Sequence, residues 1–219
     1  MPDRYRQVMM SDLPLPDWPD LSPATGLLVV VSGPSGVGKD SVIARARELG
    51  CRLHFVPTVT SRAPRPNEVD GCDYHFVSVE RFQAMIAAGE FLEWALVYGD
   101  HKGNRRADVQ AALAAGRNVV LRVDTQGAHT LRKLVPEAIL VFISPLSLEA
   151  LEERLRRRNT ESEEDLAHRL RIAREEMLTL PEFDYVVVNR HGELDAAAAR
   201  LKAIVEAEEC RVQPRRARL

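Results

Sequence analysis

The stretch GPSGVGK at residues 33–39 constrains the fold more than any other part of the chain. It matches the phosphate-binding loop pattern, in which a glycine, four further residues and a Gly-Lys pair follow a strand and open a helix. The apolar run Leu27–Val31 precedes the loop, and the helical stretch Ser41–Leu49 follows it. Backbone N–H groups of such a loop converge on an anion, and the helix N-terminus adds partial positive charge. The loop therefore predicts a phosphate site, whereas a glycine-rich turn without a ligand is the weaker alternative.

Strand-like and helical patterns alternate along the rest of the chain. Buried strands are expected at 118–123, 138–143 and 185–188, and helices at 107–115, 147–157, 163–177 and 194–205. This alternation predicts an α/β fold with a mostly parallel sheet covered by helices on both faces. Ligands of such sheets bind beyond the carboxyl ends of the strands. Because Asp124 directly follows an expected strand, its carboxylate is predicted to lie near the metal and the phosphates.

A small lobe with strands of its own is expected at about residues 55–104, between the first helix and the next core strand. Ser78 is placed to cap a helix in this lobe, and Gly89 closes that helix. The lobe has three expected extended stretches, at His54–Thr60, Asp73–Val77 and Phe91–Tyr98.

The two ends of the chain differ from the rest. Residues 1–26 carry five prolines with little periodicity, so a mobile leader outside the fold is predicted. Residues 211–219 form a basic tail that is expected to be frayed. The domain between them is bounded at about residues 27–210.

The bulk properties restrict the class of protein. A chain of 219 residues is long enough for one α/β domain with inserted lobes. The net charge of −2 gives no polycationic footprint for nucleic acid, and no apolar run approaches the length of a membrane span. The three cysteines, Cys51, Cys72 and Cys210, show neither metal spacing nor a disulfide framework, so a cytoplasmic protein is expected.

Six separated motifs together point to one family. They are GPSGVGK at 33–39, TSRAPRP at 60–66, DGCDYHF at 70–76, GEFLEW at 89–94, DTQG at 124–127 and DYVVVN at 184–189. From about Leu27 to Cys210 the chain resembles the guanylate kinase family. The resemblance implies a P-loop kinase with an inserted GMP-binding lobe and a helical lid at about 158–172. It also implies transfer of the γ-phosphoryl group of ATP to GMP with Mg²⁺, by a monomer or small homo-oligomer without nucleic-acid or membrane partners.

The resemblance assigns the GMP-binding residues. Arg62 and Arg65 match arginines on the GMP phosphate, and the guanidinium fork suits that dianion. Tyr74 matches a tyrosine whose hydroxyl donates to the same phosphate. Glu93 matches the carboxylate that reads guanine, because guanine offers N1–H and an amino group on one edge and adenine lacks that pair of donors. Thr58 matches a hydroxyl near guanine O6, and Asp124 matches a second acid near the base.

The resemblance also assigns the ATP site and the residues of catalysis. Lys39 reaches the outer phosphates, while Arg158 and Arg169 match lid arginines that stabilise charge in the transition state. Asn189 matches a position near the ATP base. The predicted ATP-binding residues are Gly33, Pro34, Ser35, Gly36, Val37, Gly38, Lys39, Asp40, Ser41 and Asn189. Four other arginines, Arg154, Arg156, Arg171 and Arg174, are expected on a solvated helical face.

Some positions depart from the family pattern. Asp40 follows Lys39 where Ser or Thr on Mg²⁺ is expected, and we predict that its carboxylate takes the metal role. The alternatives are that Ser41 serves the metal, or that Asp40 only caps the helix. Lys102 and Asn104 replace a tyrosine and a hydroxyl; Lys102 is predicted to bind the GMP phosphate as a point charge, with a solvated lysine as an equal alternative. Arg122 stands where an acid is expected.

Two other functions remain open at this stage. A ribose 1,5-bisphosphate phosphokinase shares the fold and the Gly-Lys-Asp-Ser sequence, but its sugar substrate has no guanine edge for Glu93 to read. A non-catalytic guanylate-kinase-like binding module is the other alternative, and the intact loop with Lys39 argues against it.

Overall fold

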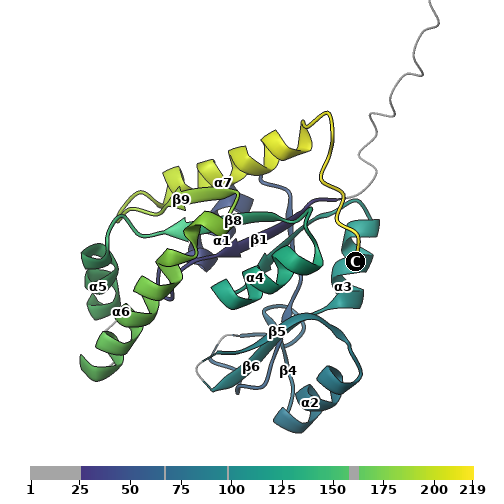
Figure 1. Cartoon of the computed structure of the whole chain (residues 1–219), viewed down its shortest axis with the longest axis horizontal. Coiled ribbons are helices and arrows are strands. Elements are labelled where there is room, and N and C mark those ends of the chain that lie inside the picture. Colours follow the sequence, from purple (N-terminus) through teal and green to yellow (C-terminus); the bar gives the residue numbers. More distant parts are fainter. Residues whose placement is uncertain (1–25, 67, 98, 158–162) are drawn as a thin grey trace, which may run out of the picture.

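The core of the molecule is a parallel sheet, seen in a computed structural model that describes residues 26–66, 68–97, 99–157 and 163–219. The five strands lie in the order β2-β7-β1-β8-β9, and every neighbouring pair is parallel (Figure 1). Their bounds are β1 Leu28–Ser32, β2 Leu53–Phe55, β7 Asn118–Arg122, β8 Ile139–Ser144 and β9 Tyr185–Val188. Because all five run in the same direction, their carboxyl ends meet at one edge of the sheet.

Helices cover both faces of this sheet, as predicted. On one face Val29 and Val31 pack with residues of α1 and α7, and on the other Leu28 and Val30 pack with residues of α3 and α4. Alternate side chains of β1 thus pack in two hydrophobic clusters, one on each face of the sheet. The covering helices are α1 Lys39–Glu48, α3 Arg106–Ala114, α4 Thr125–Leu134 and α7 Leu194–Glu209.

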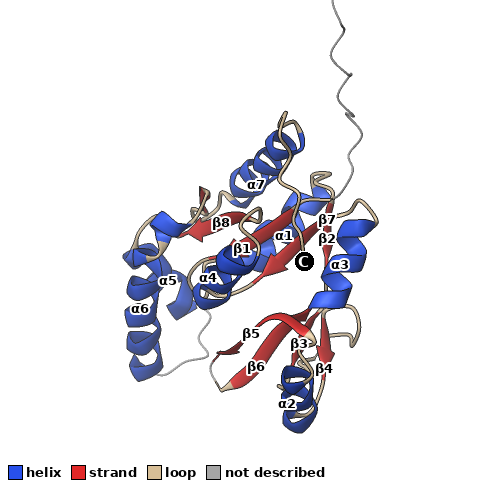
Figure 2. Ribbon diagram, turned by 45° about the vertical axis from the view of Figure 1, so that its right-hand side comes forward, coloured by secondary structure: helices blue, strands red, loops and turns tan. Residues whose placement is uncertain are grey.

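The expected lobe is a second sheet that shares no strand with the first (Figure 2). It has the strand order β4-β3-β6-β5, with β3 at Thr58–Thr60, β4 at Tyr74–Phe76, β5 at Phe91–Val97 and β6 at Asp100–Arg105. Helix α2 (Val79–Ala87) packs on it, and Ser78 caps this helix by accepting from the Arg81 amide at 3.1 Å. Phe82 and Phe91 stack in the lobe core with ring centroids 4.4 Å apart.

Three details of the predicted elements are corrected. The run His54–Thr60 is two strands in different sheets, since β2 pairs with β7 and β3 pairs with β4 and β6. Strand β6 and helix α4 were not expected from the sequence.

Helices α5 (Leu148–Arg157) and α6 (Glu163–Leu178) form a helical arm beside the core sheet. Leu151 and Leu155 of α5 pack against Leu166 and Ala173 of α6. The 3₁₀ turn Leu180–Glu182 leads from α6 into β9. The expected lid, about 158–172, overlaps α6 from residue 163; residues 158–162 lie outside the described part.

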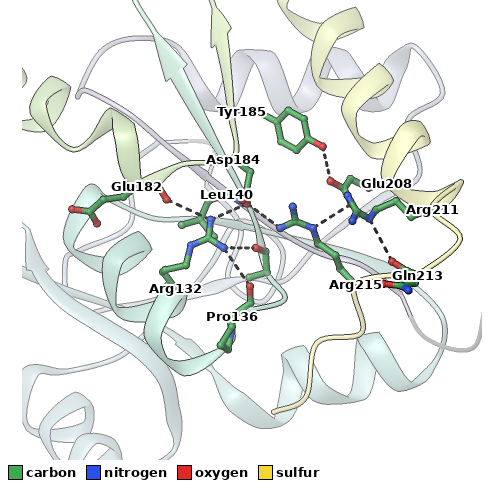
Figure 3. Close-up of polar contacts among 11 residues, drawn as sticks. Arg132, Pro136, Leu140, Glu182, Asp184, Tyr185, Glu208, Arg211, Gln213 and Arg215 are labelled. Atoms are coloured by element: carbon green, nitrogen blue, oxygen red, sulfur yellow. Dashed lines mark hydrogen bonds and ion pairs between the residues drawn. The ribbon is translucent and has the colours of Figure 1, made fainter.

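The basic tail is packed rather than frayed at Arg215 (Figure 3). The Arg215 guanidinium lies 3.2 Å from Asp184 Oδ2 and 3.3 Å from Glu208 Oε2. Glu208 is 1% exposed and accepts from the Tyr185 hydroxyl at 2.5 Å. Asp184 is also paired with Arg132 at 2.8 Å. The tail therefore joins α7 to the start of β9.

The expected leader falls outside the described residues except for Gly26. The Gly26 amide donates to the Leu113 carbonyl at 3.2 Å, so this residue already belongs to the domain. Across the described ranges, none of the helices combines the length and the apolar character needed to cross a membrane.

Candidate active site

A cleft of about 1140 Å³ opens between the carboxyl ends of the core strands and the lobe. Its volume exceeds that of an ordinary single-ligand pocket, about 300–1,000 Å³. The phosphate loop and α6 contribute lining residues from one side, and the lobe strands contribute them from the other. The predicted site residues that line it are Ser35, Gly36, Gly38, Lys39, Asp40, Ser41, Thr58, Arg65, Tyr74, Glu93, Lys102, Asp124 and Arg169.

The phosphate loop is held from behind by two side chains. Asn189 is 5% exposed and donates from Nδ2 to the Val37 carbonyl at 2.8 Å. Arg154 donates to the same carbonyl and, at 3.1 Å, to the Asn189 carbonyl. Gly38 has φ +94°, and a Cβ there would lie 2.7 Å from Asn189 Nδ2, so the position requires glycine. The expectation that Arg154 belongs to a solvated face is wrong, because it supports the loop.

Lys39 is folded onto its own loop. Its Nζ donates to the carbonyls of Gly33 at 2.5 Å and Pro34 at 3.2 Å. Burial lowers the pKa of Lys39 to about 8, although Glu176 and Asp40 oppose that shift. An anion in the loop would restore the stabilisation of the ammonium that burial removes.

Glu176 of α6 lies against the phosphate loop, near the Ser35 amide, and was not singled out from the sequence. Burial raises the pKa of Glu176 to about 7, while Lys39 and the Ser35 amide act in the opposite direction. Its Oε2 is buried and has no hydrogen-bond partner among the described residues. Its carboxyl group therefore lies beside the loop and Lys39, where the sequence predicts a phosphate site.

The end of the cleft predicted to read the base contains a buried polar group of three side chains. Glu93, 6% exposed, accepts from Asn104 Nδ2 at 2.7 Å, and the Thr58 hydroxyl donates to Asn104 Oδ1 at 3.4 Å. Burial raises the pKa of Glu93 to about 7; the Asn104 amide lowers it and Asp124 raises it further. A Cβ at position 127 would lie 2.8 Å from Glu93 Oε2, so Gly127 leaves space for this carboxylate. Asp124 itself caps α4, accepting from the Gly127 amide at 2.7 Å.

The predicted phosphate-binding arginines of the lobe are arranged around Glu68. The Arg62 guanidinium forms a two-pronged pair with Glu68 at 2.6 and 2.7 Å, and the Arg65 amide donates to it at 2.8 Å. The Arg62 guanidinium lies 4.7 Å from the ring centroid of Tyr74. Bonding to Arg62 lowers the pKa of Glu68 to about 2, so this carboxylate stays ionised and holds the fork. Arg62 lies beside the lining residue Tyr74 and does not itself line the cleft.

Asp40 is paired with Arg122. The Arg122 guanidinium donates through Nη1 to Asp40 Oδ1 and through Nη2 to the Tyr74 hydroxyl. Lys102 also lines this part of the cleft, and burial lowers its pKa. The partially buried Lys102 is thus not a freely solvated lysine.

The structure does not bring every predicted residue into the cleft. Gly33, Pro34, Val37 and Asn189 form the support of the loop rather than its inner surface, and Arg158 lies outside the described residues. Sequence reasoning missed Asn104 and Glu176. Asn104 was noted only as a departure from the family pattern; its place opposite Glu93 on β6 follows from a strand that the sequence did not reveal.

Comparison with known proteins agrees with these motifs. Residues 25–208 match the family model described as guanylate kinase. The chain is 48% identical over 194 residues to "Guanylate kinase 2, chloroplastic/mitochondrial" of Oryza sativa subsp. japonica. The aligned residues cover 88% of this chain and 68% of the rice protein. It is 47% identical over 193 residues to a guanylate kinase of Xanthomonas oryzae pv. oryzae, covering 88% and 94% of the two chains.

A solved structure is also similar. The crystal structure of guanylate kinase from Anaplasma phagocytophilum matches with a TM-score of 0.70 and 31% identity, over 89% of this chain and 90% of the other. Sequence motifs, fold and relatives therefore agree that the chain belongs to the guanylate kinase family.

Proposed function

We propose that this chain transfers the γ-phosphoryl group of ATP to GMP, giving ADP and GDP, and that the cleft described above is where both nucleotides bind. One observation carries the assignment: a phosphate loop and a buried carboxylate suited to guanine line the same cleft from opposite sides. Phosphoryl transfer depends on positioning two substrates and neutralising charge, and it requires little covalent chemistry from the protein.

The donor half of the site is proposed to act through the loop and α6. Ser35, Gly36 and Gly38 would present backbone N–H groups to the phosphates of ATP, and Lys39 would leave its loop carbonyls to reach the outer phosphates. Arg169, which lines the cleft from α6, would contact the transferring group together with Arg158. Asn189 would act by holding the loop in shape.

The acceptor half is proposed to read GMP at both ends. Glu93, held by Asn104 and aided by Thr58 and Asp124, would accept from the two donors of guanine. At the other end, Arg65 and Tyr74 line the cleft and would bind the phosphate. Arg62 would exchange Glu68 for the phosphate, and Lys102 would add a point charge.

A divalent metal ion is proposed to accompany ATP, and Mg²⁺ fits the oxygen donors here. The described residues contain no group of three or more His, Cys, Asp or Glu side chains that could hold a metal by themselves. Mg²⁺ commonly binds through one or two carboxylates with substrate phosphates and water, so Asp40, beside Lys39, is the proposed protein ligand. When bound, the ion would neutralise charge on the phosphates.

We further infer that the protein acts in the cytoplasm on free nucleotides, without nucleic-acid or membrane partners, as a monomer or small homo-oligomer. Three free cysteines, two of them exposed, suit a reducing compartment. Light scattering coupled to size-exclusion chromatography measures the oligomeric state directly.

The test of the proposed reaction is ADP release with three acceptors. The purified protein is expected to turn over GMP far faster than AMP, because a site built to pair with two donors rejects an analogue that lacks them by large factors. Ribose 1,5-bisphosphate should not be phosphorylated. Equal rates with GMP and AMP, or a preference for the sugar phosphate, would contradict the assignment, and no turnover of any acceptor would favour a binding module.

A further inference from the structure

Arg122 occupies the junction between the two halves of the cleft. It is the last residue of β7 and lies in register beside Val31 of β1, the strand that leads into the phosphate loop. The guanidinium therefore reaches Asp40, one residue beyond Lys39, on one side. On the other side it reaches the hydroxyl of Tyr74, on the lobe strand β4. Among the described residues, this side chain bonds to both the donor half and the acceptor half of the site.

The surroundings of Arg122 suit an anion. Its side chain is 17% exposed and lines the cleft, with Lys102 nearby and its guanidinium carbon 5.3 Å from the Tyr74 ring centroid. A guanidinium carries five N–H donors in a fixed fork. The bonds to Asp40 and Tyr74 engage one N–H on each terminal nitrogen, so donors remain for phosphate oxygens.

We propose that Arg122 is a catalytic cation of this reaction: its guanidinium binds the GMP phosphate beside Tyr74 and contacts the phosphoryl group in transfer, while Asp40 positions it. The proposal rests on the proposed function of the cleft. It gives Arg122 a role that the family pattern did not predict, because an acid is expected at this position.

The chemical step requires positive charge between the GMP phosphate and the γ-phosphoryl group of ATP. A GMP phosphate oxygen forms a bond to the γ-phosphorus of ATP, and the bond from that phosphorus to the bridging oxygen breaks. The electron pair of the broken bond remains on that oxygen, which becomes a terminal oxygen of the β-phosphate of ADP. Two anions must approach each other before this happens. A fixed guanidinium that contacts both lowers the repulsion and needs no reorganisation during the reaction.

Asp40 fits the positioning role. The pairing of Asp40 with one branch of the Arg122 fork fixes the fork's direction. Asp40 Oδ1 accepts this bond, so the other carboxylate oxygen would be available to hold a metal ion while Asp40 orients Arg122. A serine in its place, which the phosphate-loop pattern expects, would give Arg122 no charged partner on this side.

The central experiment replaces Arg122 and compares steady-state rates. Arg122→Met is expected to lower kcat at saturating ATP and GMP by about 100-fold or more, the effect of removing one preorganised donor to a transition state. The KM for GMP should rise several-fold, whereas the KM for ATP should change little. Arg122→Lys keeps the charge without the fork and should recover part of the lost kcat. Arg117→Met, an exposed arginine just before the amino end of the same strand, is the matched control and should behave as wild type.

The outcomes separate this proposal from a structural role and from failure of the reaction itself. Thermal unfolding of each variant tests folding; if Arg122→Met is unstable, Arg122→Lys with a wild-type midpoint decides, and it should lose at least tenfold in kcat. A kcat within threefold of wild type in a folded variant would overturn the proposal while leaving GMP phosphorylation by the wild type intact. A wild type that does not phosphorylate GMP would instead contradict the proposed function.

A double-mutant cycle tests the part assigned to Asp40. If Asp40 also acts through Arg122, Asp40→Asn at saturating Mg²⁺ should lower kcat more in the wild-type background than in the Arg122→Met background, where only its proposed metal role remains. Fully additive losses would show that Asp40 acts independently of Arg122, and the positioning role would be wrong.

Discussion

Among single residues, Glu93 is expected to make the binding of GMP depend on pH. Its pKa is raised to about 7, and only the ionised carboxylate accepts from both donors of guanine. Since an acid with a raised pKa is protonated below that value, the KM for GMP should rise as the pH falls through about 7. Initial rates over this range at saturating ATP measure the effect.

The control for this prediction is Glu93→Gln. It should raise the KM for GMP by about 100-fold or more, because one donor of guanine is left unpaired. The remaining pH dependence should be that of the GMP phosphate, whose second pKa is about 6. A wild-type profile identical in shape to that of Glu93→Gln would show that Glu93 does not titrate in this range.

Arg154 provides a second prediction at the same scale. Arg154→Met removes the donor to the Asn189 carbonyl and one of the two donors to the Val37 carbonyl, which keeps its bond from Asn189 Nδ2. A buried carbonyl left unpaired costs about 1–3 kcal/mol. The free energy of unfolding should fall by about that amount, and the KM for ATP should rise more than the KM for GMP. Arg156→Met on the same helix removes only exposed pairs with Glu152 and Glu163 and should leave both quantities nearly unchanged. Equal effects of the two substitutions would contradict the support role.

Site residues could be predicted from the sequence where the residues that act together are neighbours along the chain. The loop around Lys39 and the arginines of TSRAPRP are local patterns, and the structure brings Lys39 and Arg65 to one cleft. The pairing of Asp40 with Arg122 joins residues 82 positions apart, and that of Arg154 with Val37 joins residues 117 apart. No local pattern encodes such contacts, because they depend on strand order and on how α5 packs.

Among the secondary-structure elements, β6 and α4 show why some could not be predicted from the sequence. The strand β6 has the sequence DHKGNR, with no β-branched residue and no Tyr, Phe or Trp, and forms because β3 and β5 pair with it on both sides. The helix α4 begins at a cap, Asp124, that was read only as a site acid. By contrast, β1, β8 and β9 are apolar runs in a parallel sheet, and their pattern was sufficient.

At the scale of elements, the packing of the basic tail on α7 and the start of β9 predicts a contribution to stability. Arg215→Ala should lower the free energy of unfolding by about 3–5 kcal/mol at most, since it removes a partner of the buried carboxylate of Glu208. The catalytic constants should not change, because the tail does not line the cleft. Arg216→Ala, an exposed neighbour, is the control. Chemical denaturation followed by circular dichroism measures both variants; equal stability would show that the ion pairs contribute nothing.

At the scale of the whole molecule, the described residues form two sheets with the cleft between them, and we expect this cleft to close on substrates. Lys39 lies on the core, Tyr74 on the lobe and Arg169 on α6, and transfer requires these groups to converge and water to be excluded. Small-angle X-ray scattering should give a smaller radius of gyration when a bisubstrate analogue of ATP and GMP is bound. An unchanged radius at saturation, with binding confirmed by calorimetry, would contradict closure.

The overall architecture was predictable from the sequence because alternating patterns fix a parallel sheet and the phosphate loop fixes its active edge. The second sheet, β3 to β6, lies between β2 and α3, where the sequence interrupts that alternation. Its internal pairing was not predictable, since its strands are short and β3 pairs with β6, a strand distant in sequence.

The lobe is one uninterrupted stretch of chain, from β3 to β6, set between two strands of the core sheet. Thr58, Tyr74 and Glu93 all fall inside it, whereas Lys39 and the rest of the phosphate loop lie outside it. Most residues proposed to recognise the acceptor thus lie in one continuous segment separate from the phosphate loop, while Arg122 and Asp124 are contributed by the core. Replacement of the β3–β6 segment alone can therefore change the acceptor specificity while the phosphate loop continues to bind ATP. The same segment is the one to replace in the design of a kinase for a new acceptor.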